Sequence, residues 1–166
     1  ILKKQLEKTA DEWMELYLQD GNIAAEPYRN SIQAMEHPAV LESCDYLARH
    51  HGFEVTRVGV DSEGVVDVGE FADAIRDDST LCSIMYANNE VGTVQPIATI
   101  AAAAHRRGTV FPTDAVQAGG SLELSLEALG VDALSISGHK VGAPKGTGAL
   151  IARARVGIEP ILSGGG

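Results

Sequence analysis

The order of apolar and polar residues from residue 31 onward is what most constrains the fold. Strand-like segments alternate there with segments of helical periodicity. Strands are predicted at 31–35, 53–60, 80–86, 109–111, 131–136 and 148–152, and helices at 38–51, 71–76, 97–107 and 126–129. This alternation predicts an α/β domain with a mostly parallel sheet flanked by helices, whose ligand sites lie at the carboxyl ends of the strands.

Local signals support the predicted helix ends. Pro38 is favoured in the first turn of a helix, and Gly52 lies just past the predicted end of the same helix. Asp67, followed three residues later by Glu70, resembles a capping box. Gly108 ends the helix predicted before it.

The first 30 residues differ from the rest of the chain. Apolar residues recur there at helical spacing, which predicts an amphipathic helix over 1–18 with a linker after it. The predicted organisation is therefore an N-terminal helix and linker at 1–30 and a core at 31–166. Because the chain begins at Ile1 and stops in a glycine run, we interpret it as a fragment, truncated at its C-terminus.

Composition excludes several classes of function. Acidic residues outnumber basic ones by 23 to 13, and the net charge of −10 is opposite to that of a nucleic-acid-binding surface. The most apolar stretch, 97–104, is far shorter than the ~20 residues that cross a bilayer, and no secretory signal is visible. Cys44 and Cys82 fit buried thiols in a reducing cytosol. We expect a cytoplasmic protein that binds neither nucleic acid nor membrane.

Four groups of polar residues follow predicted strands. They are Glu36-His37, Asn88-Asn89-Glu90, Asp114 with Gln117, and Ser137-Gly138-His139-Lys140. Because the carboxyl ends of parallel strands meet at one edge of a sheet, we expect these groups to converge. The glycine-rich stretch 138–148 lacks the residue order of a P-loop or a dinucleotide fingerprint. The histidines and carboxylates show no local metal-ligand spacing, so no metal site is predicted.

Three of these side chains have the chemistry that pyridoxal 5'-phosphate requires. The aldehyde of this cofactor binds a lysine amine, its ring nitrogen needs a carboxylate to remain protonated, and its ring stacks on a flat side chain. Lys140, Asp114 and His37 would serve in that order. Taken singly, each has an ordinary explanation, such as a solvated lysine or a strand-end cap. Taken together, they favour the cofactor.

The motifs resemble those of the cysteine desulfurases, pyridoxal-phosphate enzymes of the aminotransferase class V group. The resemblance covers about residues 29–166 and rests on Glu36-His37-Pro38-Ala39-Val40-Leu41, Asn88-Asn89-Glu90-Val91-Gly92, Asp114-Ala115-Val116-Gln117, Ser137-Gly138-His139-Lys140 and Pro144-Lys145-Gly146. It implies the aspartate-aminotransferase-like fold (PLP fold type I), of which this chain would be an incomplete large domain, and a homodimer. It also implies that Lys140 binds the cofactor covalently and moves the substrate Cα proton, while His37 stacks on the ring and acts in acid/base steps.

The same resemblance implies roles for the remaining polar residues. Asp114 would pair with the pyridinium, Gln117 would hydrogen-bond the phenolic oxygen, and Asn89 would lie near that oxygen and the substrate carboxylate. Ser137 and His139 would reach the phosphate. Two features of the family are missing: its persulfide-forming cysteine, expected beyond residue 166, and the Gly-Ala-Thr segment that opens its phosphate-binding helix. A histidine that often precedes the aspartate by two residues is replaced by proline.

The implied function is removal of sulfur from L-cysteine, giving L-alanine and an enzyme persulfide. The sulfur would pass to an acceptor or scaffold protein for iron–sulfur cluster assembly or thiolation. Without the persulfide cysteine, the fragment alone is expected to be inactive. Selenocysteine lyase and other class V enzymes share the scaffold and the cofactor. An alternative of another class is a non-catalytic dimerisation piece, which failure to bind the cofactor would favour.

Overall fold

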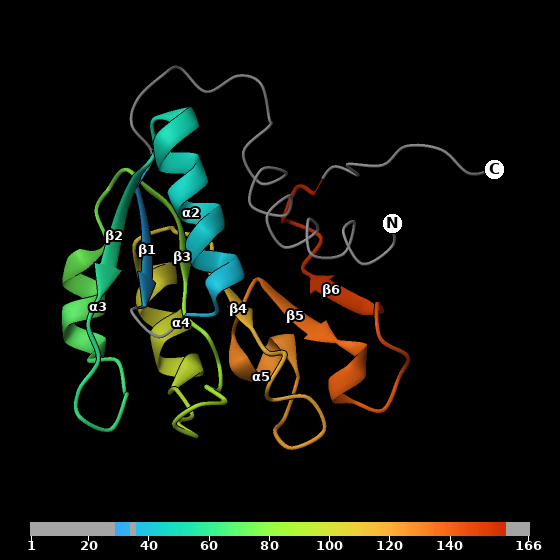
Figure 1. Ribbon diagram of the computed structural model, residues 1–166. Helices are drawn as coiled ribbons and strands as arrows, with labels where there is room; N and C mark the ends of the chain where they lie inside the picture. The colour runs from blue at the N-terminus through green and yellow to red at the C-terminus, as the bar shows by residue number, and fades with distance from the viewer. Residues whose placement is uncertain (1–28, 34–35, 159–166) are drawn as a thin grey trace.

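The computed structural model describes residues 29–33 and 36–158 (Figure 1). The helix predicted at 1–18, most of the linker after it and the terminal glycine run lie outside these residues, as does the end of the strand predicted at 31–35. The described strands are β1 (Arg29–Gln33), β2 (Glu54–Val58), β3 (Ser79–Ser83), β4 (Pro112–Asp114), β5 (Ala133–Ser137) and β6 (Gly148–Ala152).

The strands form two three-stranded sheets that meet along one line. Their orders are β2-β1-β3 and β4-β5-β6. A parallel bridge pairs Leu81 with Val110, and the N–H of Cys82 donates to the carbonyl of Val110 at 2.9 Å, so β3 and β4 run side by side. All pairs are parallel except β5 with β6, which is antiparallel. The prediction of a mostly parallel sheet is confirmed.

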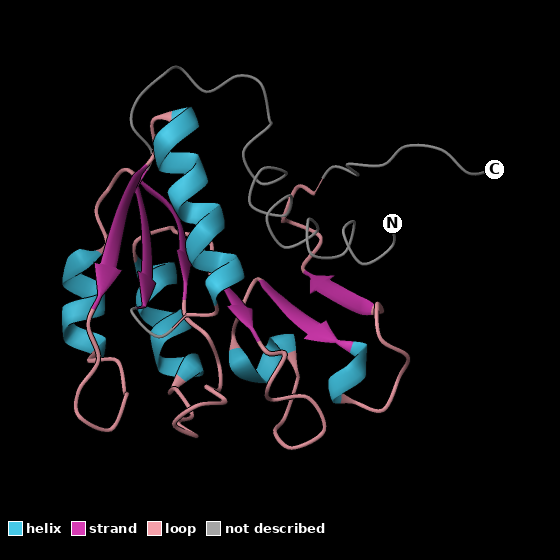
Figure 2. Ribbon diagram, viewed as in Figure 1, coloured by secondary structure: helices cyan, strands magenta, loops and turns pink. Residues whose placement is uncertain are grey.

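Helices flank the sheet on both faces (Figures 1 and 2). The described helices are α2 (Pro38–His51), α3 (Val68–Ala74), α4 (Ile97–Arg106) and α5 (Leu126–Leu129), with a 3-10 turn, η1, at Gly138–Lys140. From β1 the chain crosses to β2 in one direction, and from β2 it proceeds through β3, β4 and β5 in the other. Right-handed crossovers therefore put α2 on one face and α3, α4 and α5 on the other. None of the described helices is long and apolar enough to span a membrane.

The predicted ends of α2 are confirmed, and α4 begins as predicted at Ile97 and ends at Arg106, one residue before the predicted end. Pro38 opens α2, and Gly52 closes it in the left-handed conformation, with φ of 75°. The Asp67 carboxylate caps α3 by accepting the N–H of Glu70 at 2.9 Å, and this helix begins before the predicted 71–76. The capping residue therefore marks the helix start better than the apolar periodicity does.

The main core lies between the sheet and the face carrying α3 and α4. Phe71 of α3 and Phe111 are fully buried and meet edge to face, with ring centroids 6.0 Å apart. On α4 the buried residues are Ile97, Ile100, Ala101, Ala103 and Ala104, most of them three or four positions apart along one face of the helix. Both cysteines are fully buried, as predicted.

One strand is displaced from its predicted position. The sequence favours 109–111 because its residues are apolar or β-branched, whereas β4 is Pro112–Asp114. Residues 112–114 pair with β5 in unbroken register, while the segment before them contributes a single bridge at Val110. The prediction of a strand confined to 109–111 is wrong, and Asp114 is the last residue of the strand instead of following it.

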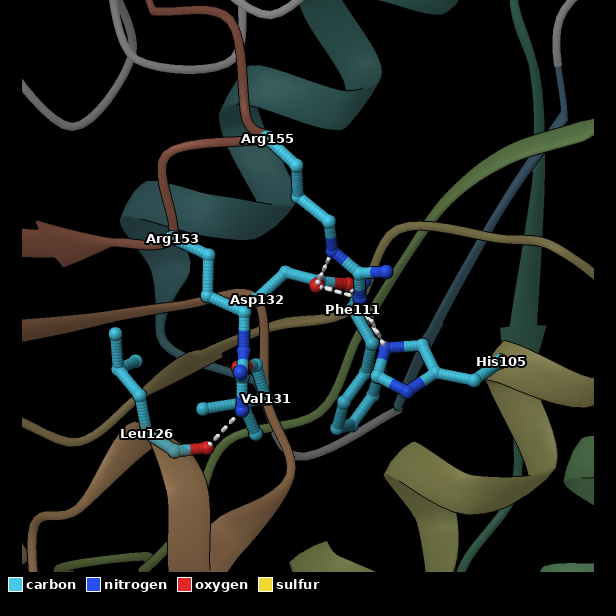
Figure 3. A network of polar contacts seen from close by, with 7 residues as sticks. All are labelled: His105, Phe111, Leu126, Val131, Asp132, Arg153 and Arg155. Carbon is cyan, nitrogen blue, oxygen red and sulfur yellow. Dashed lines mark hydrogen bonds and ion pairs between the residues drawn. The ribbon is translucent and has the colours of Figure 1, made fainter.

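A polar cluster stabilises the edge at which β4 and β5 begin (Figure 3). Asp132 is 1% exposed, and its carboxylate accepts from the N–H of Phe111 at 2.9 Å, from the ring of His105 at 2.9 Å and from the guanidinium of Arg155. Arg153 donates to the carbonyls of Val131 and Leu126. The cluster thus joins the end of α4, the starts of two strands and the segment after β6.

Candidate cofactor site

The strand order reverses between β1 and β3, and we call the edge at the carboxyl ends of these two strands the crevice. These strands are neighbours, yet the helices that follow them, α2 and α4, lie on opposite faces of the sheet. Such a reversal is where open α/β sheets bind ligands. The arrowheads of β1 to β5 point toward one edge, the lower side of Figure 2, and the four predicted polar groups lie at or just past the carboxyl ends of β1, β3, β4 and β5.

His37 stands at the entrance of α2 and caps the helix with its own side chain. The ring Nδ1 accepts the N–H of Ala39 at 3.2 Å. An accepting Nδ1 carries no hydrogen, so the ring proton of the neutral imidazole is on Nε2. This bond holds the ring in an exposed orientation beside the crevice. A flat side chain is therefore available for stacking, as the sequence predicts.

Asp114 lies at the end of β4, two strands away from β1. Its carboxylate oxygen Oδ1 accepts from the N–H of Val116 at 2.8 Å and from the hydroxyl of Ser135 at 3.4 Å. Burial raises the pKa of Asp114, while the hydrogen bond from Val116 and the nearby His37 oppose that rise. The ionised form of a carboxyl in such a place is stabilised by a neighbouring cation. A protonated ring nitrogen would supply that cation.

Ser137 is the last residue of β5, and His139 and Lys140 follow it in the 3-10 turn. The hydroxyl of Ser137 lies 2.7 Å from Nδ1 of His139, and Lys140 is exposed at the end of the turn. Gly138 is buried beneath the segment that returns to β6, and its N–H donates to the carbonyl of Thr147 at 2.8 Å. The side chain of Lys140 is thus exposed, while this hydrogen bond holds the backbone of the turn that carries it.

Asn89 and Gln117 occupy turns at the same edge. The side chain of Asn88 accepts the N–H groups of Glu90 and Val91, so Asn88 builds the turn and Asn89 projects from it, exposed. Gln117 is partly buried in the turn after β4. Within residues 29–33 and 36–158 no hydrogen bond joins Lys140 directly to Asp114 or His37. The predicted residues share an edge without forming one bonded network.

Sequence reasoning missed two side chains that support this edge, Ser83 and Ser135, and gave no role to a third, Glu36. Glu36 belongs to one of the four predicted polar groups, and the structure shows it buried and hydrogen-bonded to Ser83. Ser135 contacts Asp114 from β5. Ser135 could have been found, because it is two residues before Ser137 and alternate residues of a strand share a face. No local signal identifies Ser83.

The residues present fit pyridoxal 5'-phosphate. The edge offers an exposed lysine amine, a half-buried carboxylate whose pKa burial raises, and a fixed imidazole ring. These groups match the aldehyde, the ring nitrogen and the ring face of the cofactor. In the part of the chain that the structure describes, no three His, Cys, Asp or Glu side chains come close enough to hold a metal ion.

Comparison with known proteins identifies the family. The profile of the aminotransferase class-V family matches residues 29–166. The chain belongs to this family. A cysteine desulfurase of Gluconacetobacter diazotrophicus is 46% identical over 139 residues, which are 82% of this chain and 35% of that protein. The class V chain therefore spans about a third of the length of this curated relative.

Solved structures agree with the fold. A NifS-like protein superposes with a TM-score of 0.87 at 36% identity, over 96% of this class V chain and 44% of the other. A second structure, SspA in complex with cysteine, gives a TM-score of 0.85 at 32% identity, over 96% of this chain and 46% of the other. The predicted PLP fold type I is confirmed, and the chain represents part of it.

Proposed function

We propose that this chain contributes the cofactor-binding core of a cysteine desulfurase, a pyridoxal-phosphate enzyme that removes sulfur from L-cysteine and leaves L-alanine. The observation that carries the proposal is the placement of Lys140, Asp114 and His37 at the carboxyl edge of a class V sheet. Similarity to a named cysteine desulfurase and to a structure that holds cysteine supports this choice of substrate.

Each of the three residues has a separate task in this proposal. The bound cofactor draws electrons from the Cα atom of the substrate. Asp114 would carry the negative charge that keeps the ring nitrogen protonated. His37 would cover the ring and present its Nε2–H as a hydrogen-bond donor. The exposed amine of Lys140 would hold the cofactor through its aldehyde and, when free, would take the Cα proton of the substrate.

The sulfur has to leave on a thiol other than Cys44 or Cys82. Both side chains are fully buried, and burial raises the pKa of the Cys44 thiol to about 12, with the nearby Glu36 and Asp45 adding to the rise. A buried protonated thiol is not a nucleophile. We propose that the sulfur-accepting thiol belongs to another segment or an added thiol, so the chain alone does not turn over cysteine.

The remaining elements of the proposal concern the setting of the enzyme. A cytoplasmic location is supported by Cys44 and Cys82, which form no disulfide and therefore suit a reducing compartment. A homodimer is supported by the resemblance of the chain as a whole to the family. Delivery of sulfur to an acceptor or scaffold protein for iron–sulfur cluster assembly or thiolation is supported by the likeness of residues 144–150 to the branch that serves iron–sulfur biogenesis.

Reductive trapping tests the proposal. The purified protein is mixed with pyridoxal 5'-phosphate and reduced with borohydride, and the modified lysine is located by peptide mass. We expect one adduct at Lys140 that is lost in Lys140→Ala and kept in Lys145→Ala, a matched exposed lysine in the same loop. Adding L-cysteine with an external thiol should then release alanine and sulfide.

Two results would contradict the proposal. Scattered labelling that survives in Lys140→Ala would mean that no specific cofactor site exists, which favours a non-catalytic dimerisation role. A specific adduct without alanine release from cysteine, while selenocysteine or another amino acid reacts, would assign the cofactor site to a different class V reaction.

A further inference from the structure

Glu36 is a buried carboxyl at the crevice to which the proposed mechanism gives no role. Its side chain is 4% exposed, and Oε1 accepts from the hydroxyl of Ser83 at 2.8 Å. The second oxygen, Oε2, is buried and has no hydrogen-bond partner within the described part of the chain. Buried carboxyls are costly unless they are bonded or uncharged, so such a residue needs an explanation.

The position of Glu36 supplies one. In the register of β1 with β3, Ile32 pairs with Ser83, so the Glu36–Ser83 bond connects the two strands just past their paired ends. The carboxyl ends of these two strands border the crevice. Glu36 also immediately precedes His37, whose ring is already fixed on its other side by the N–H of Ala39.

We propose that Glu36 is a positioning residue of the cofactor site, whose hydrogen bond to Ser83 holds the turn between β1 and α2 so that the ring of His37 stays beside Asp114. This inference rests on the proposed function for its consequence on cofactor binding. The position of His37, in contrast, can be measured in the absence of the cofactor.

The protonation of Glu36 agrees with this role. Burial raises the pKa of Glu36 to about 8, and the charge of Asp114 adds to the rise, while the bond from Ser83 and the backbone N–H groups of His37 and Met85 oppose it. The other titratable neighbours are the thiol of Cys44 and the ring of His37. Near neutral pH the acid is uncharged, and Asp114 is spared a second negative charge beside it.

Three variants and one control test the proposal. Glu36→Gln keeps a neutral carbonyl acceptor for Ser83, whereas Glu36→Ala and Ser83→Ala each remove the bond. Glu42→Gln is the matched control, because Glu42 is exposed on α2. Two readouts are used: the NMR resonance of the His37 ring without cofactor, assigned with His37→Asn, and the binding constant and visible circular dichroism of added pyridoxal 5'-phosphate.

We expect Glu36→Ala and Ser83→Ala to shift the His37 resonance, to weaken cofactor binding about tenfold and to reduce the dichroism, as loss of a buried hydrogen bond predicts. Glu36→Gln should restore all three toward the parent values, and Glu42→Gln should change none. If the alanine variants leave the His37 resonance unmoved, or Glu36→Gln behaves like Glu36→Ala, the proposal is wrong.

The two readouts separate this inference from the proposed function. Absence of cofactor binding in the parent protein would overturn the proposed function, whereas the His37 resonance would still decide whether Glu36 positions that ring. If Glu36→Ala does not fold, comparison of Ser83→Ala with Glu36→Gln still shows whether the Glu36–Ser83 bond positions the ring of His37.

Discussion

At the scale of single residues, Asp114 concentrates the charge of the site. Both hydrogen bonds that its carboxylate accepts within the described residues reach Oδ1, which leaves Oδ2 for a ligand. Asp114→Asn keeps the shape and removes the charge. In the assay with an external thiol, we expect cysteine turnover to fall by roughly a hundredfold or more, on the scale of lost charge stabilisation, while the borohydride adduct at Lys140 still forms.

Asp73→Asn on the exposed face of α3 is the matched control for that measurement and should leave turnover unchanged. Turnover of Asp114→Asn within twofold of the parent would show that Asp114 does not face the cofactor nitrogen.

Gly138 is required by close packing beneath the lysine turn. A Cβ atom at this position would overlap Oγ1 of Thr147 and approach Cβ of Ala143 to 3.0 Å. Gly138→Ala should therefore destabilise the fold by about 1–3 kcal/mol and lower the yield of the Lys140 adduct. Urea denaturation and reductive trapping measure the two effects.

Gly157→Ala is the control, because nothing lies within 4 Å of the Cβ that it would gain. A second substitution, Thr147→Ala, should recover part of the stability lost in Gly138→Ala. Equal stability of Gly138→Ala and the parent would refute the packing argument.

At the scale of elements, the sequence predicts features set by neighbouring residues, such as helix ends, and does not predict features set by contacts between distant residues. The ends of α2 are predictable because Pro38 and Gly52 act on the backbone of their own turn. β4 is not, because its pairing with β5 sets its position, and Pro112 at its first residue argues locally against a strand. The contacts of Asp132 with His105 and Arg155 span 27 and 23 residues and have no sequence signature.

The Asp132 cluster should make a large contribution to the stability of the elements that it joins. Asp132→Asn leaves the guanidinium of Arg155 and the buried N–H of Phe111 without their charged acceptor. We expect a loss of about 2 kcal/mol in the free energy of unfolding, because the buried Asp132 loses its charge-assisted hydrogen bonds while Arg155, 62% exposed, can turn to solvent. Urea denaturation at neutral pH measures this loss.

Asp45→Asn provides the comparison, since the Asp45–Arg57 pair at 2.8 Å is about half exposed and should contribute less than about 1 kcal/mol. Similar losses in the two variants would show that burial does not set the strength of the Asp132 cluster.

At the scale of the whole molecule, two buried carboxyls with opposite shifts set how stability depends on pH. Burial favours a raised pKa for Asp132, but the bonds from Phe111, Arg155 and His105 outweigh it and lower the pKa. Its contribution is therefore present above the ordinary value of 3.8 and is lost as pH falls below it. The raised pKa of Glu36 acts in the other direction.

The folded protein binds the Glu36 proton more tightly than the unfolded chain does. The stability that this proton provides is complete below pH 4.5 and is lost progressively as pH rises to about 8. Glu36→Gln has no proton to lose, so its stability relative to the parent should increase between pH 5 and pH 9, by up to roughly 4 kcal/mol.

Urea denaturation of both proteins across this pH range tests that prediction, with Glu42→Gln as the exposed control. Parallel stability curves for Glu36→Gln and the parent would show that Glu36 is ionised throughout, and the prediction would fail.

The sequence predicts which residues lie at the candidate site, but it does not predict the buried hydrogen bond that holds one side of that site. Lys140, Asp114 and His37 could be named because their chemistry follows strands, and parallel strands end at one edge. The burial of Glu36 and its bond to Ser83 could not, because they depend on how β1 lies against β3.

The cap that His37 places on α2 also limits which way protons can travel through its ring. Nδ1 accepts the N–H of Ala39 and the ring proton is on Nε2, so the neutral ring has no free lone pair with which to take up a proton while the cap is intact. Relay through an imidazole needs both nitrogens, one on each side. The capped His37 can therefore donate a hydrogen bond at Nε2, but it can neither store a proton nor conduct one from the helix to the crevice, and any net delivery of protons has to come from solvent or from Lys140.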